Sequence, residues 1–391
     1  MPYYKPVFDA LGDDKRAAAL ADRLFRLRSQ LTNELPERNV SRSILVATWN
    51  IREFGRNQKC GQRLDSSLLC IAEIVSHFDL VAIQEVNQNL HDLKRLIALL
   101  GNWWNYIVTD VTEGRAGNQE RMAFLFDSRK IQFDHLAGEV ALPPEEKGAV
   151  RQLARSPFLC AFRSGWRRTT ICSVHIYYGA AKANEPRKVA EIAQLTGLLD
   201  KRNIRRTSEA DGEPENIILL GDFNIFNKTG DDTSAAMEKN HFVIPASIRR
   251  IPAGGNLARD KFYDQIAFHD PRGQLKATAK AGVFEFTRTI FGVGAAEDYV
   301  ADMLASAPEK YQAHSKTDKS RDAFYRQWRT FQISDHFPLW VEIQTDFTSN
   351  FLGSQIRRGK SPGPLSANAV PLNKAATRKA RAGKADKGRV K

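Results

Sequence analysis

The sequence is poor in cysteine and has no long apolar run, and each absence excludes a class of protein. Four cysteines among 391 residues cannot form the disulfide framework of a small secreted domain, and their spacing matches no zinc site. No apolar run approaches the length of a membrane span, and the first residues lack the basic-then-apolar pattern of a secretory signal. Early acidic residues, Asp9, Asp13, Asp14 and Asp22, also count against a mitochondrial presequence. We therefore expect an intracellular, cytoplasmic protein whose cysteines are reduced.

Acidic residues are nearly missing from the C-terminal end, where the positive charge is concentrated. Residues 348–391 hold eleven Lys or Arg and one acidic residue, Asp386, so they carry +10 of the net charge of +13. Their Ser, Pro, Gly, Ala and Lys composition predicts disorder. We expect this basic tail to bind the phosphate backbone of a nucleic acid without sequence preference. The alternative is a tail that only increases solubility.

Apolar periodicity predicts one large α+β domain. Leucines at helical spacing indicate an amphipathic helix over residues 13–32, within a helical extension of residues 1–42. Further helices are expected after Asp65, at Leu90–Leu100 and at Arg187–Leu199, the last followed by a charged loop, Lys201–Glu215. Strands are expected at Ile44–Thr48, Leu80–Ile83, Tyr106–Val108, Met122–Phe126, Phe158–Arg163, Thr169–Val174, Ile217–Leu220 and Val341–Ile343. This mixture predicts a four-layer sandwich of two packed mixed β-sheets flanked by helices, formed by residues 43–347 with a polar insertion at about 275–327.

Many of the predicted strands end in a polar residue. Ile217–Leu220 is followed by Gly221, and then by Asp222 and Asn224. The same design recurs at the ends of other strands, at Asn50, Glu85, His175, Asp264 and His336. One such Asp or Asn is usually a turn residue that satisfies its own backbone. Six such strand ends that meet at one cleft instead predict a metal-dependent site that cleaves a phosphodiester bond.

The residue types suit this chemistry. Mg²⁺ prefers hard oxygen ligands and keeps several waters, so one or two carboxylates suffice to bind it. Glu85 is the first candidate ligand, Asp335 and Asn50 would complete the shell, and Mn²⁺ could replace Mg²⁺. His175 and His336 lie in similar settings and offer two imidazoles for proton transfer near neutral pH.

Together these residues resemble the endonuclease/exonuclease/phosphatase superfamily, and most closely its deoxyribonuclease I branch. The motifs that carry the likeness follow Glu85 in the expected order, and they are Gly221-Asp222-Phe223-Asn224 and Ser334-Asp335-His336-Phe337-Pro338. The likeness spans about Ile44–Ile343. It implies the deoxyribonuclease I-like form of the sandwich.

The resemblance also implies two histidine–carboxylate pairs on either side of one phosphate. Glu120, just before the strand Met122–Phe126, is similar to the family's glutamate that pairs with the first histidine, here His175. Asp264 lies in Tyr263-Asp264-Gln265-Ile266, which resembles the segment whose aspartate pairs with the second histidine, here His336.

Other positions are implied to contact the substrate. Arg155-Ser156-Pro157 is similar to the family's Arg-x-Pro, whose guanidinium contacts the scissile phosphate. Asp222 and Asn224 would orient the attacking water and a phosphoryl oxygen, and Asn50 would also contact the substrate.

Three departures from the family pattern concern the grip on DNA. Asn118 and Gln265 replace a tyrosine and an arginine, and the cysteines that secreted members carry after Gly221-Asp222 are absent. The sequence therefore does not predict a secreted digestive enzyme.

The leading prediction is a monomeric, Mg²⁺-dependent endonuclease that hydrolyses DNA and, by resemblance, leaves 5′-phosphate and 3′-hydroxyl ends. One alternative is an enzyme of the same superfamily that acts on a lipid or inositol phosphate. It is disfavoured because Leu220 and Ile225-Phe226-Asn227 stand where inositol-polyphosphate phosphatases carry tryptophan and arginine. Another alternative is a nucleic-acid-binding protein that has lost catalysis.

Overall fold

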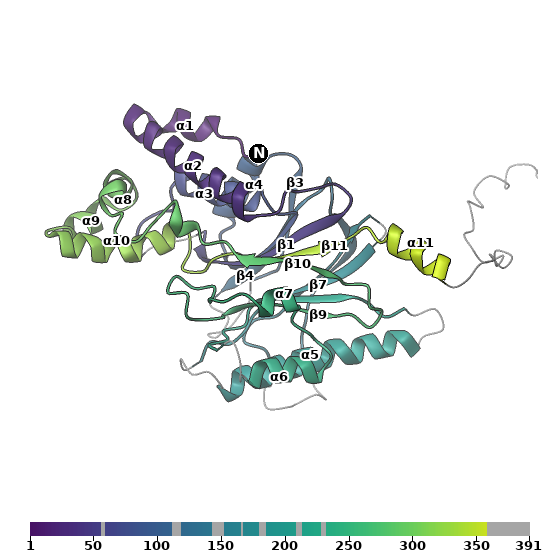
Figure 1. The fold of residues 1–391 in the computed structure, drawn as a ribbon. Coiled ribbons are helices and arrows are strands. Elements are labelled where there is room, and N and C mark those ends of the chain that lie inside the picture. The colour runs from purple at the N-terminus through teal and green to yellow at the C-terminus, as the bar shows by residue number, and fades with distance from the viewer. Residues whose placement is uncertain are drawn as a thin grey trace, which may run out of the picture. The chain divides into compact units, whose positions relative to one another are not determined.

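The computed structural model describes residues 1–55, 59–111, 119–142, 152–165, 167–179, 185–208, 213–227 and 232–357. The chain divides into two units, Met1–Thr345 and Asp346–Lys391. In the first unit two β-sheets pack face to face, and helices cover the outer face of each sheet (Figure 1). The predicted α+β class, two packed mixed sheets flanked by helices, is confirmed.

The first sheet, sheet A, has six strands in the described chain, in the order β10-β11-β1-β2-β4-β3. Its strands are β1 (Ser43–Phe54), β2 (Leu80–Asn87), β3 (Trp104–Val108), β4 (Glu120–Asp127), β10 (Ala277–Val283) and β11 (Leu339–Gln344). The central pair, β1 and β2, is parallel, and the outer pairs are antiparallel.

The second sheet, sheet B, has five strands in the described chain, in the order β5-β6-β7-β8-β9. Its strands are β5 (Gln132–Glu139), β6 (Phe158–Ser164), β7 (Arg167–His175), β8 (Ile217–Asp222) and β9 (Asp264–His269). Here β7 and β8 are parallel, so His175 and Asp222 lie side by side at their carboxyl ends.

Helices pack on the outer faces through apolar stripes. Those on sheet A are α1 (Lys5–Leu11), α2 (Asp14–Glu34), α3 (Asp65–Val75), α4 (His91–Leu100), α8 (Val300–Ser306), α9 (Pro308–His314) and α10 (Asp318–Gln332), with short 3₁₀ turns at Phe286–Arg288 and Glu297–Tyr299. Those on sheet B are α5 (Pro186–Ser208) and α6 (Asp232–Lys239), and the single turn α7 (Ala246–Arg249) lies near β10. None of the described helices is both long and apolar enough to cross a membrane.

Alternation along β1 decides which residues face the space between the sheets. Ala47, Trp49 and Ile51 pack outward under the helices, whereas Val46 belongs to the core between the sheets. Because side chains alternate along a strand, Thr48 and Asn50 share the inward face with Val46. Asn50 therefore lies between the two sheets, at the point where the regular pairing of β1 with β2 ends, which is where the predicted site lies.

Several sequence-based expectations need correction. The predicted loop Lys201–Glu215 is wrong in its first part, because α5 continues to Ser208. The segment 275–327 begins with β10, an edge strand paired with β11, and continues with helices that bury Tyr299 and Met303 in the core over sheet A. It thus packs as part of the sandwich, and its interpretation as an insertion stays a prediction.

The second unit also differs from the prediction where it is described. A helix, α11 (Thr348–Arg357), occupies the start of the segment expected to be disordered. The rest of the basic tail, residues 358–391, and Asn118 lie outside the described residues. The cysteines are buried and free, as expected of reduced thiols.

Candidate active site

Polar residues from both sheets line one cleft of about 630 Å³. Nine of the ten predicted site residues line it, namely Asn50, Glu85, Glu120, Arg155, His175, Asp222, Asn224, Asp335 and His336. The tenth, Asp264, is buried directly behind His336. The structure thus brings the predicted set together, while the role of each residue stays a prediction.

Asn50 links the two sheets at the floor of the cleft. Its Nδ2 donates to Glu85 Oε1 on sheet A and to Asp222 Oδ2 on sheet B, each at 3.0 Å. Glu85 has a φ of +59° where the pairing of β2 with β4 shifts register, and this departure from strand geometry turns its carboxylate toward Asn50. A left-handed backbone at a non-glycine residue costs about 1–3 kcal/mol and is typical of functional sites.

The oxygen donors around Asn50 fit a divalent cation. Asn50 Oδ1 is buried and has no hydrogen-bond partner among the described residues. Burial raises the pKa of Glu85, and the nearby carboxylates of Glu120 and Asp335 oppose its ionisation further, although His175 favours it. A bound cation would satisfy the unpartnered oxygen and offset this concentration of negative charge. Glu85 and Asn50 are therefore the residues best placed to hold it.

Asp335, the third predicted ligand, lies on the rim of the cleft. Its Oδ2 is 3.2 Å from Arg52 Nη1, and its side chain is 37% exposed. Arg52 in turn donates to Thr330 Oγ1 at 2.8 Å. Asp335 thus faces the same cleft as Glu85, but its partner in the structure is an arginine.

The first histidine–carboxylate pair is His175 with Glu120. His175 Nδ1 lies 3.1 Å from Glu120 Oε2, within ion-pair distance but without the geometry of a hydrogen bond. The same carboxylate accepts from Arg155 Nε at 2.7 Å, so Glu120 links the imidazole to the guanidinium. Burial would raise the pKa of Glu120, but His175 and Arg155 outweigh it and lower the pKa to about 2.

The second pair is His336 with Asp264. His336 Nδ1 lies 2.9 Å from Asp264 Oδ2 in a buried hydrogen bond. Burial disfavours the imidazolium, but the carboxylates of Asp264 and Asp222 outweigh it and hold the pKa of His336 well above its ordinary value. The ring of Tyr263 lies 5.5 Å from that of His336, centroid to centroid, and helps to fix its plane.

Asp222 lies between the two imidazoles. Its Oδ2 is 3.7 Å from His175 Nε2 and 3.9 Å from His336 Nε2. Gly221, which precedes it, has a φ of +141°, and a Cβ there would lie 2.0 Å from the carbonyl oxygen of Val174, so only glycine fits. Asp222 Oδ1 accepts from the backbone N of Asn224 at 2.8 Å, which closes the turn.

Two buried charges on α5 hold the loops of the site, and sequence reasoning missed both. Glu191 accepts from the backbone N of Ala154, at 3.1 Å, and of Tyr177, at 3.2 Å, which anchors the segments next to Arg155 and His175. Lys188 Nζ donates to the carbonyl oxygen of Asn224 at 2.7 Å. Both side chains are fully buried. The available signal was their position in phase with the apolar stripe of the helix, at Ile192, Leu195 and Leu199.

A separate histidine cluster on sheet B does not have the proton arrangement of a metal site. Asp200 Oδ1 lies 2.8 Å from His269 Nε2 and 3.2 Å from His241 Nδ1. Asn203 is held by the backbone of Glu215, because its Oδ1 accepts at 2.7 Å and its Nδ2 donates at 2.8 Å. Its other N–H faces His269 Nδ1 at 3.1 Å, so Nδ1 accepts and Nε2 keeps the proton that it donates to Asp200. The group is a structural hydrogen-bond chain.

The chain belongs to the endonuclease/exonuclease/phosphatase family, whose model matches residues 47–336. It is therefore a hydrolase of this superfamily, whose enzymes generally depend on a divalent metal ion. No curated protein matches the chain in sequence.

Several solved structures are similar to this chain at low sequence identity. An endonuclease/exonuclease/phosphatase family protein from Bacteroides thetaiotaomicron is 18% identical, covers 78% of this chain and 95% of its own, and has a TM-score of 0.49. A mannosyl-6-phosphatase from the same organism is also 18% identical, with 77% and 99% covered and a TM-score of 0.46. The human Nocturnin catalytic domain is 13% identical, with 77% and 94% covered and a TM-score of 0.47. At this distance the neighbours do not identify a substrate.

Proposed function

We propose that this protein is a Mg²⁺-dependent endonuclease that hydrolyses the phosphodiester bonds of DNA. The observation that carries the proposal is the placing of two imidazoles, each backed by its own carboxylate, within 4 Å of Asp222 Oδ2. Hydrolysis of a diester needs one proton taken from water and one delivered to the leaving oxygen. Two separate histidine–carboxylate pairs in one cleft supply both functions.

The residues divide the work by position. One imidazole, held by Glu120 or Asp264, accepts the proton of the attacking water, and the other protonates the leaving oxygen. Asp222 lies between them and orients the water by accepting its second proton in a hydrogen bond. Bound at Glu85 and Asn50 Oδ1, Mg²⁺ would stabilise negative charge on the phosphoryl and leaving oxygens.

Arg155 is the residue best placed to bind the scissile phosphate. Its Nε is bonded to Glu120, and its side chain lines the cleft beside His175. A guanidinium offers several donors in one plane and matches phosphate oxygens. Arg52 and Lys59 also line the cleft, but each pairs with a carboxylate there, Asp335 and Glu53 respectively.

The basic tail is proposed as a second contact with DNA, one that adds affinity without selecting a sequence. Removing residues from about 350 onward should weaken binding and flatten its dependence on salt, because fewer counterions are released. Turnover on short oligonucleotides should change little. An unchanged salt slope would count against this role.

Incubating supercoiled plasmid with the protein and Mg²⁺ tests the activity. Nicking is expected with Mg²⁺ and should be abolished by EDTA and by His175→Ala. Parallel assays with inositol phosphates and sphingomyelin address the alternative substrates. Turnover of either ester without nicking would replace the DNA proposal, and nicking that persists in the variant would remove the role of His175.

A further inference from the structure

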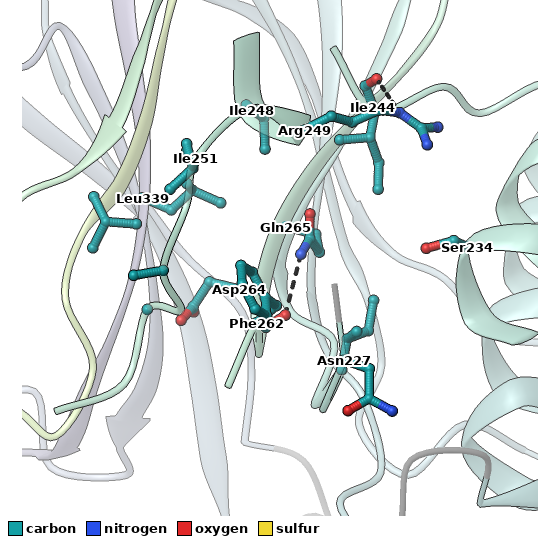
Figure 2. Close-up of a pocket in the computed structure, with 14 residues that line it drawn as sticks. Asn227, Ser234, Ile244, Ile248, Arg249, Ile251, Phe262, Asp264, Gln265 and Leu339 are labelled. Carbon is teal, nitrogen blue, oxygen red and sulfur yellow. Dashed lines mark hydrogen bonds between the residues drawn. The ribbon is translucent and has the colours of Figure 1, made fainter. Parts of the chain in front are cut away.

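A second cavity, of about 110 Å³, borders Asp264. None of the residues that line it also lines the catalytic cleft. Figure 2 shows Asp264 at its wall, with the apolar side chains of Ile248, Ile251 and Leu339 on one side and Ile244 beyond Gln265. The cavity is therefore largely apolar, but it includes a carboxylate that belongs to the proposed catalytic apparatus.

One oxygen of Asp264 is left without a partner. Asp264 is 4% exposed, and its Oδ2 accepts from His336 at 2.9 Å. Its Oδ1 is buried and has no hydrogen-bond partner among the described residues. An unmet acceptor on a buried carboxylate is unfavourable, so a donor is expected beside it.

Two other polar side chains at the cavity, Gln265 and Arg249, are engaged elsewhere. Gln265 Nε2 donates to the carbonyl oxygen of Phe262 at 3.1 Å, and Arg249 Nε donates to that of Ile244 at 3.1 Å, as the dashed lines in Figure 2 show. Arg249 also pairs with Glu238. No described residue donates to Asp264 Oδ1, so this oxygen is left to an occupant.

We propose that this cavity binds a small uncharged molecule with one O–H or N–H donor on a compact apolar body. The donor would bond to Asp264 Oδ1, and the apolar body would pack against the isoleucines. A water molecule would satisfy the oxygen but not the apolar walls, whereas an apolar cavity of roughly 150 Å³ is large enough to bind benzene. Ring molecules of about six heavy atoms are the appropriate size class.

Binding here would touch the carboxylate that holds His336 from its other side. An occupant would therefore influence the position of that imidazole without entering the catalytic cleft. This coupling rests on the proposed function, whereas the binding itself does not.

Two probes of nearly the same shape test the proposal on the full chain: cyclopentanol, which donates a hydrogen bond, and cyclopentanone, which only accepts one. Saturation-transfer NMR measures the affinity of each without reference to hydrolysis. Cyclopentanol is expected to bind about tenfold more tightly, because the ketone oxygen would face a carboxylate oxygen. Ala253→Leu, which fills the cavity, should abolish binding, and Ala279→Leu, the same change on the exposed strand β10, should not.

Asp264→Asn gives the sharpest outcome. The new carboxamide should keep its oxygen bonded to His336 and turn its NH₂ into the cavity. Cyclopentanone should then bind more tightly than cyclopentanol. Equal binding of the two probes, an unchanged preference in Asp264→Asn, or binding of neither probe would each overturn the proposal. None of these outcomes bears on whether the cleft cleaves DNA.

Discussion

The two histidine–carboxylate pairs have the same chemistry but are built in opposite directions across the sandwich. In the first pair the carboxylate, Glu120, comes from sheet A and the imidazole, His175, from sheet B. In the second pair Asp264 comes from sheet B, and His336 precedes β11 of sheet A. Neither pair forms unless the two sheets pack, so catalytic geometry and core packing depend on each other.

The pairs also differ in what the carboxylate does. Glu120 is shared with Arg155 and is partly open to the cleft, with its side chain 16% exposed. Asp264 is almost fully enclosed, and His336 is the side chain that it is seen to bind. In the proposed mechanism the first pair therefore combines phosphate binding with proton transfer, and the second serves proton transfer alone. This difference predicts distinct kinetic defects.

The largest effect is expected from Asp264→Asn. A carboxamide cannot stabilise the imidazolium of His336, so kcat should fall by roughly 10³-fold with little change in KM. Glu120→Gln should cost roughly tenfold in kcat and should also raise KM, because Arg155 loses its anchor. Steady-state kinetics on one oligonucleotide, with folding checked by circular dichroism, distinguishes them. If both variants lowered kcat and changed KM to the same extent, the proposed difference between the two pairs would be contradicted.

Arg155→Lys should come next, with kcat/KM lowered by roughly 10²-fold. Lysine keeps the charge but loses the planar fork that can bind Glu120 and a phosphate together. Arg52→Lys is the matched control, since Arg52 pairs with Asp335 at the rim and should cost much less. A larger loss of kcat/KM in Arg52→Lys than in Arg155→Lys would indicate that the phosphate binds at the rim.

Replacing the buried charges on α5 should have a smaller effect. Glu191 anchors the backbone of Ala154 and Tyr177, and Glu191→Gln replaces one of the two accepting oxygens. This variant should lower kcat/KM by roughly tenfold, with kcat reduced and KM raised as in Glu120→Gln. Lys188→Met should instead disturb the turn of Asp222 and Asn224 and thereby affect both pairs. Measured kcat, KM and thermal unfolding of the two variants test this division. Loss of stability with unchanged kinetics would reduce both residues to a structural role.

The smallest effect concerns acid stability. The pKa of Glu120 is lowered to about 2, so its ionised form stabilises the fold above the ordinary glutamate pKa of about 4.3, and this contribution is lost as the pH falls toward 2. The free energy of unfolding, measured with denaturant between about pH 5 and 2.5, should therefore fall less steeply for Glu120→Gln than for the natural protein. Parallel curves would show that the first pair contributes nothing to stability.

Much of the site could be predicted because its residues follow apolar strands, and such strands have a clear signal. Asp222 and His175 each terminate a buried strand, Glu85 follows the apolar part of β2, and all three lie in the cleft. β5 and β10 were missed because they are edge strands with no buried residue and no apolar alternation. Lys188 and Glu191 were missed for another reason: a charged residue on a helix is usually solvated, and only the packed loops around α5 reveal their partners.

The pairing of Asn50 with both Glu85 and Asp222 was also beyond the sequence. It depends on the positive φ of Glu85 and on the distance between the sheets, and neither of these leaves a pattern in the local sequence. The same holds for the cavity behind Asp264, which is lined by segments far apart along the chain.

The account depends most on the two imidazoles serving one phosphate, and a double-variant experiment tests this directly. Single-turnover cleavage of supercoiled plasmid with Mg²⁺ would be compared among the natural protein, His175→Ala, His336→Ala and the variant with both changes. Residues that act as a unit are strongly non-additive, so the double variant should retain about the same residual rate as the weaker single variant. Losses that multiply, or full activity in either single variant, would show that the two histidines do not share a site.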